Sequence, residues 1–124
     1  MCRGIRRTLS IVALLSLVLG IASCSAPGKG RKAEEGFKNA EPIIAALKSY
    51  HERRNRYPAT LQELVPEYLA ERAWRRSEAA TLGDVFAYQQ VGQSYELKFT
   101  YTGPGINNCI YQPEASKWEC FGHY

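Results

Sequence analysis

The sequence predicts a small α+β domain, in which an N-terminal amphipathic helix and a short second helix pack on a small antiparallel sheet. Apolar residues recur every three or four positions from 33 to 54, and they alternate with polar residues from 85 to 101. Turn residues then separate further short strands after residue 103. Helices followed by antiparallel strands form layers around one core, and 124 residues leave no room for a second core.

The first helix is expected from Ala33 to Arg54, with charged residues between its apolar positions. Pro42 leaves two alternatives open: the helix proper starts near Glu41 with the proline in its first turn, or a longer helix is kinked there. The apolar face expected to be buried consists of Phe37, Ala40, Ile44, Leu47 and Tyr50.

A turn and a short second helix come next. Pro58 pushes Tyr57 out of helical geometry, and Thr60 and Glu63 then have the spacing of a capping box. The helix that begins there carries two leucines on one face, and Pro66 limits its length.

After the second helix the chain is expected to return to the core and then to lose regular structure. Tyr68 and Leu69 are placed against the first helix. From Ala70 to Gly83 the sequence is polar, with Trp74 alone inside it, so an irregular connection is expected there.

The strand pattern predicts two hairpins. In the first, Gly92-Gln93 forms the turn, and alternate residues between Tyr95 and Tyr101 share one apolar face. In the second, a turn at Pro113 to Ser116 lies midway between Cys109 and Cys120, so these two cysteines face each other. Tyr111 and Trp118 face each other for the same reason.

The N-terminal segment has the order of a signal peptide: a basic start, an apolar run from Leu9 to Ile21, and the small residues Ala22 and Ser23. The stretch from Leu9 to Leu19, interrupted only by Ser10 and Ser16, is too short for a stable membrane-spanning helix, which needs about 20 residues. We expect residues 1–23 to be removed, residues 24–32 to form a lipidated cysteine with a flexible tether, and residues 33–124 to form the single domain.

The segment from Leu19 to Cys24 resembles the lipobox of bacterial lipoproteins, in which small residues precede a cysteine. The resemblance implies cleavage before Cys24 and diacylglycerol on its thiol, with a new amino terminus that can accept an N-acyl chain; no other cofactor is expected. Two or more chains anchor a protein stably. Ser25, in place of aspartate, favours the outer membrane, facing the periplasm, in a Gram-negative cell. The alternative is an ordinary secreted protein.

The remaining cysteines form one pair. Cys2 leaves with the signal peptide and Cys24 carries lipid, so Cys109 and Cys120 are expected to form a disulfide in an oxidising compartment. Closing this loop stabilises the fold by roughly 3 kcal/mol on the chain-entropy model. Two free buried thiols are the alternative.

The charge argues against nucleic acid as a partner. The net charge of +4 includes Arg3, Arg6 and Arg7, and it falls to +1 when the signal peptide is removed. A nearly neutral chain lacks the excess of cations that binds phosphates. Local basic residues, such as Lys29, Arg31 and Lys32, contact anionic lipid headgroups or simply solubilise the tether.

The order of elements resembles the soluble head domain of type IV pilins, and most closely the pseudopilins of type II secretion systems. The residues that carry the resemblance lie in the helix at 43–50, in Arg56-Tyr57-Pro58, and in the leucine-rich segment 61–69. The resemblance implies a pilin-like fold. It implies little chemistry, since fold and function are separable.

Two departures from these families limit what the resemblance implies. The position that holds glutamate in prepilins is Leu9 here, and the apolar segment is expected to be cut off at Cys24. The chain then lacks the helix that packs a filament core. The calcium loop of pseudopilins is also not visible after Gly103.

No pattern of catalytic or metal-ligating residues stands out. His51 and His123 are far apart, and neither has a second ligand at a useful spacing. A cluster of Arg53, Arg54 and Arg56 is a candidate site for an acidic partner, and a charged helix end near the negative pole of its dipole is the alternative.

We therefore expect a noncatalytic, membrane-anchored module of the cell envelope that binds or assembles with another envelope protein. The alternative is a lipoprotein that binds a small ligand, a sugar or a peptide, in a groove lined by aromatic residues. An enzyme is not expected.

Overall fold

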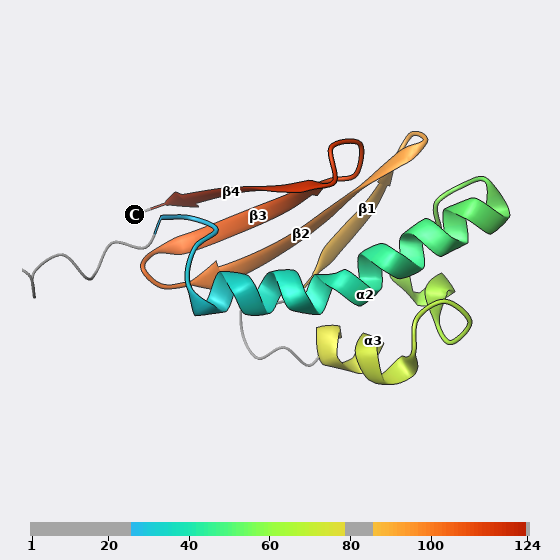
Figure 1. Cartoon of the computed structure of the whole chain (residues 1–124), viewed down its shortest axis with the longest axis horizontal. Coiled ribbons are helices and arrows are strands. Elements are labelled where there is room, and N and C mark those ends of the chain that lie inside the picture. Colours follow the sequence, from blue (N-terminus) through green and yellow to red (C-terminus); the bar gives the residue numbers. More distant parts are fainter. Residues whose placement is uncertain (1–25, 79–85, 124) are drawn as a thin grey trace, which may run out of the picture.

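The computed structural model describes residues 26–78 and 86–123, so the predicted signal peptide and Cys24 lie outside the described residues. The chain forms helices first and a sheet after them, which confirms the predicted α+β class (Figure 1). The elements are α2 (Arg31–Arg54), η1 (Leu61–Leu64), α3 (Glu71–Glu78), β1 (Ala87–Val91), β2 (Ser94–Thr102), β3 (Ile106–Gln112) and β4 (Lys117–His123).

The sheet is an antiparallel meander in the order β1-β2-β3-β4. Gly92 has a φ of 59° in the two-residue turn between β1 and β2, a conformation that glycine adopts without strain. In the second hairpin Cys109 pairs with Cys120 and Tyr111 pairs with Trp118, as the spacing predicted. The two cysteines form a disulfide with an S–S distance of 2.02 Å.

Helix α2 is longer than the sequence suggested. It begins at Arg31, two residues before Ala33, and continues through Pro42, so the longer of the two alternatives is correct. It ends at Arg54, and the next residue, Asn55, adopts the left-handed conformation and donates its backbone N–H to the carbonyl of His51 at 2.8 Å. Asparagine tolerates this conformation better than most residues, which explains the stop.

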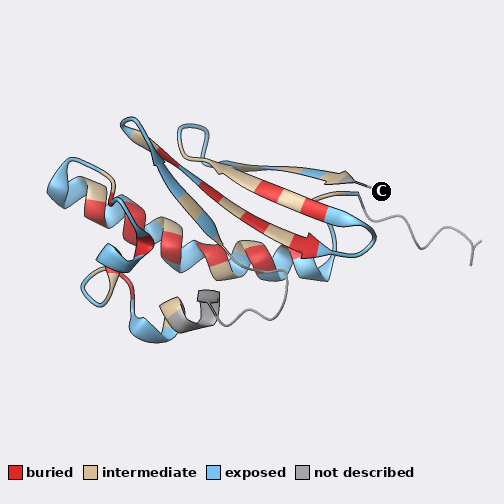
Figure 2. Ribbon diagram, turned by 180° about the vertical axis from the view of Figure 1, so that it is seen from behind, coloured by how far each residue is buried: buried red, intermediate tan, exposed pale blue. Residues whose placement is uncertain are grey.

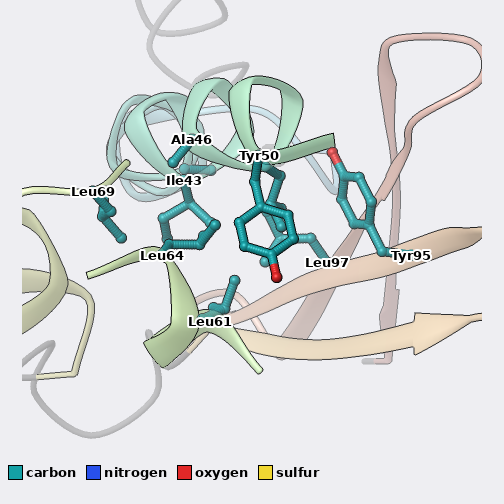
Figure 3. Packing of buried hydrophobic residues seen from close by; sticks show 10 residues of the cluster. Ile43, Ala46, Tyr50, Leu61, Leu64, Leu69, Tyr95 and Leu97 are labelled. Atoms are coloured by element: carbon teal, nitrogen blue, oxygen red, sulfur yellow. The ribbon is translucent and has the colours of Figure 1, made fainter. Parts of the chain in front are cut away.

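One face of α2 packs on the aromatic face of β2, where Tyr95, Leu97, Phe99 and Tyr101 are all buried (Figures 2 and 3). The buried stripe of the helix is displaced from the predicted one, because Phe37 and Ile44 are only half-buried. The buried residues of α2 are Ala33, Gly36, Ala40, Ile43, Ala46, Leu47 and Tyr50.

At Gly36 the helix lies close against the sheet. A Cβ added there would overlap the Phe99 ring, with the ring carbon Cδ2 at 2.7 Å. Glycine in a helix is less favourable than alanine by about 1 kcal/mol, so its place here is explained by packing.

The second helix is a single turn of 3-10 helix with the predicted capping box between Thr60 and Glu63. Leu69 is buried in the core beside α2, and the Tyr68 ring lies edge-on to Tyr50 at 5.2 Å, so both packed as expected.

The prediction of an irregular connection from Ala70 to Gly83 is wrong for the first part of this segment. Residues Glu71–Glu78 form α3, while residues 79–83 lie outside the described residues. The segment contains neither glycine nor proline, begins with an acidic first turn, and places Trp74 against the core, so a helix is stable there.

We expect Gly36→Ala to destabilise the protein by about 1–2 kcal/mol, because the overlap with Phe99 exceeds the gain in helix propensity. Chemical denaturation of the purified protein measures this. Ser49→Ala, at an exposed position of the same helix, is the matched control and is expected to be neutral or slightly stabilising. An unchanged midpoint for Gly36→Ala would show that the helix can move away from the sheet without cost.

Candidate binding surface at the tip of the domain

Helix α2 runs from one end of the domain to the other. Residues 26–30, the β2–β3 turn and the C-terminal end of β4 lie together at one end, called the base (Figure 1). The C-terminal end of α2 and the β1–β2 turn lie at the other, called the tip. A helix of 24 residues is about 36 Å long, so the two ends are well separated.

The three arginines singled out from the sequence come together at the tip, where they flank two glutamates. Arg53 and Arg54 both approach Glu67, with N···O distances of 3.6 and 3.9 Å. Arg56 approaches Glu63 at 3.9 Å. The sequence did not predict that these two carboxylates pair with the arginines, because Glu63 and Glu67 reach the arginines only after the chain turns at Pro58.

The arginines also lie over tyrosine rings. The Arg53 guanidinium is 5.7 Å from the centre of the Tyr68 ring, while those of Arg54 and Arg56 are 6.0 and 5.5 Å from the centre of Tyr50. Their side chains remain 70%, 53% and 57% exposed. Ion pairs exposed to this extent contribute at most about 1 kcal/mol, so the guanidinium groups remain available to a partner's carboxylates.

Glu63 connects the arginines to the core. Its carboxylate accepts hydrogen bonds from the Tyr50 hydroxyl at 3.0 Å and from the backbone N–H groups of Ala59 and Thr60 at 2.8 and 3.2 Å. Burial raises the pKa of Glu63, but these hydrogen bonds and the Arg56 charge outweigh burial and lower the pKa below its usual value. The carboxylate therefore stays ionised in mild acid.

A polar groove of about 350 Å³ lies beside the arginines. His51 stacks on Tyr57 in its wall, with ring centres 4.4 Å apart, and Tyr57 in turn meets Tyr95 edge-on at 4.8 Å. The groove combines an aromatic pair with amide and guanidinium donors, a set that suits a small polar ligand. Its lining residues are His51, Asn55, Arg56, Tyr57, Gln90, Gly92 and Gln93.

Sequence reasoning missed the groove because Gln90 and Gln93 come from the first hairpin and meet the end of α2 only in the folded chain. Among residues 26–78 and 86–123, no group of three or more histidine, cysteine, aspartate or glutamate side chains is placed to bind a metal ion. In the same residues, no helix combines the length and the apolar character that crossing a bilayer requires.

Replacing Glu63 with glutamine is expected to lower the free energy of unfolding at neutral pH by about 1–2 kcal/mol, because three hydrogen bonds to a charged acceptor are weakened. The pKa of Glu63 is lower in the folded protein than its ordinary value of 4.5. This stabilisation is therefore fully present above pH 4.5, and it is lost as the pH falls through the lower pKa of the folded protein. The difference between the two proteins should therefore shrink in acid.

Urea denaturation at a series of pH values measures this difference. Glu52→Gln removes the same charge from an exposed position of α2 and is expected to change stability by less than about 0.5 kcal/mol. A Glu63→Gln difference that is independent of pH would contradict the assigned role of the carboxylate.

Comparison with known protein families, with curated proteins and with solved structures gives no match to this chain. The resemblance to pilin head domains therefore stays a prediction from the sequence.

Proposed function

We propose that the protein is a lipoprotein of the cell envelope, anchored through lipid on Cys24, and that its tip binds an acidic segment of another envelope protein. The observation that carries the binding role is the cluster of Arg53, Arg54 and Arg56, more than half exposed, at the end of α2 opposite residues 26–30. The module is noncatalytic and contributes to assembly by holding its partner near the membrane.

The chemistry of the tip supports a protein partner. Arginine and tyrosine are the residues that most often dominate the energy of protein interfaces. Here the Tyr50 and Tyr68 rings restrict the motion of the guanidinium groups that lie over them, which reduces the entropy lost on binding. Guanidinium groups recognise carboxylates through paired hydrogen bonds, so an acidic segment is the partner that fits.

The groove favours a second candidate function, the binding of a small sugar or peptide. The His51–Tyr57 stack offers an aromatic face, and Gln90 and Gln93 offer amide hydrogen bonds beside it. A thermal-shift screen of the purified protein against envelope sugars and short peptides tests this role. A ligand that stabilises the protein, and loses its effect in Gln90→Ala, would favour it over the protein-binding role.

Changing Cys24 to alanine is expected to abolish lipid attachment and to release the protein from the membrane fraction, because no acyl chain then holds it. Metabolic labelling with a palmitate analogue and fractionation of the cells measure both effects. Cys2→Ala is the matched control, since Cys2 lies in the segment expected to be removed. Labelling that persists in Cys24→Ala would contradict the proposed anchor.

Replacing all three arginines with alanine is expected to abolish a partner contact at the tip while leaving the protein on the membrane. A photo-crosslinking residue at Gln62, an exposed position of η1, reports this contact in intact cells. Lys48→Ala, which removes a cation from an exposed position of α2, is the control. A crosslinked product that is equally abundant in the triple variant would rule out the arginines as its binding site.

A further inference from the structure

We infer that the base of the domain rests on the membrane surface in a fixed orientation, with cations and apolar side chains directed at anionic lipid headgroups. This inference depends on the proposed lipid anchor at Cys24 and adds an interaction surface to it. The basal surface is defined by Lys29, Arg31, Lys32, Ile106 and Phe121.

The first observation is that the chain next to the anchor belongs to the fold. Residues 26–29 form a turn closed by a hydrogen bond from the Lys29 N–H to the Ala26 carbonyl at 3.0 Å. Pro27 and Gly28 occupy its central positions, and Gly28 has a φ of 78°, which are the features of a type II turn. The sequence suggested a flexible tether here, whereas the structure contains an ordered turn.

This turn is attached to the sheet. The Gly28 N–H donates to the Tyr101 hydroxyl at 2.8 Å. A Cβ added at Gly28 would lie 3.0 Å from the Cβ and Sγ atoms of Cys120, so the turn packs against the disulfide. The chain is therefore held to the fold from Gly28 onward.

The attachment limits the distance between the domain and the bilayer. Only four peptide units join Cys24 to Gly28, and a fully extended chain of that length spans no more than about 14 Å. A lipid chain on Cys24 therefore holds the base, and not the tip, beside the headgroups. A tether of nine free residues would reach about twice as far and would let the domain turn over.

The base carries the cations that suit an anionic surface. Lys29 is exposed, Arg31 lies 3.8 Å from Glu35, and the Lys32 ammonium donates to the Thr102 carbonyl at 2.6 Å. Glu34 and Glu35 are on the same turn of α2, so the excess of positive charge is small. Electrostatics alone would not fix the orientation, but the short tether has already placed this end at the membrane.

The base also carries two of the three large apolar side chains that are exposed in the described residues, and Val91 is the third. Ile106 is 54% exposed and Phe121 is 45% exposed. Ile106 pairs with His123 and Phe121 pairs with Asn108, so the two are diagonal neighbours on the face of the sheet away from α2. Apolar residues beside cations are the combination found at membrane interfaces.

The experiment uses the full, lipidated protein in vesicles of phosphatidylcholine with and without phosphatidylglycerol. Cys109 and Cys120 are paired, so one introduced cysteine carries a fluorescent label. Thr102→Cys labels the base and Gln93→Cys labels the tip, and both positions are exposed. Lipids with a quencher at the headgroup are expected to quench the label at position 102 severalfold more than the label at 93, and more strongly in anionic vesicles.

Charge variants test the headgroup contact itself. Lys29→Gln is expected to reduce the ratio of membrane-contacting to free domains about fivefold in anionic vesicles, the effect of one cation near a charged surface. Lys48→Gln, away from the base on α2, should leave that ratio unchanged. An equal effect of the two variants would overturn the assignment of Lys29.

Flotation of the vesicles separates failure of this inference from failure of the proposed function. Protein that does not float with the vesicles lacks the anchor, and both proposals then fail. Protein that floats but shows equal quenching at positions 93 and 102 retains the anchor and overturns the fixed orientation alone. A dimer on the vesicles, with label 102 shielded from the lipid quencher by a second copy, also overturns it.

Discussion

The close contact between Gly36 and the Phe99 ring determines how closely α2 lies on the sheet. Because glycine has no side chain, α2 approaches the sheet closely enough for the Phe37 ring to meet the rings of Phe99 and Trp118 at 5.5 and 5.4 Å. Aromatic contacts at these distances add to the energy of burial. The contact also sets the rotation of α2, which determines the face that is buried along the whole helix.

The rotation of α2 about its own axis determines which side chains it presents at both ends of the domain. The same face of α2 that carries Gly36 near the base carries Tyr50 near the tip, where its hydroxyl donates to Glu63 and its ring lies beneath Arg54 and Arg56. The arginines are therefore positioned by core packing and not by one another. Their geometry depends on Gly36, which lies 17 to 20 positions earlier in the sequence.

The sequence predicted features that depend on local patterns, including the fold class, the turn at Gly92, the cross-strand pairing of Cys109 with Cys120, and the capping box. It failed where a local pattern was weak. The sequence did not predict α3, because the segment around Trp74 is polar and Ala73 and Trp74 meet the core only in the folded chain. The partners of the arginines and the residues of the groove could not be predicted, because they come together only through long-range packing.

The two basic clusters of the domain are not equivalent, and the difference follows from their surroundings. At the tip, Glu63 and Glu67 lie beside the three arginines, and tyrosine rings lie under the guanidinium groups, so the positive charge there has a defined geometry. At the base, Lys29 projects from a turn into solvent, and its charge acts on any anionic surface nearby. A diffuse charge beside residues 26–30 and a geometrically defined one about 36 Å away suit the proposed module, which would contact lipid at one end and protein at the other.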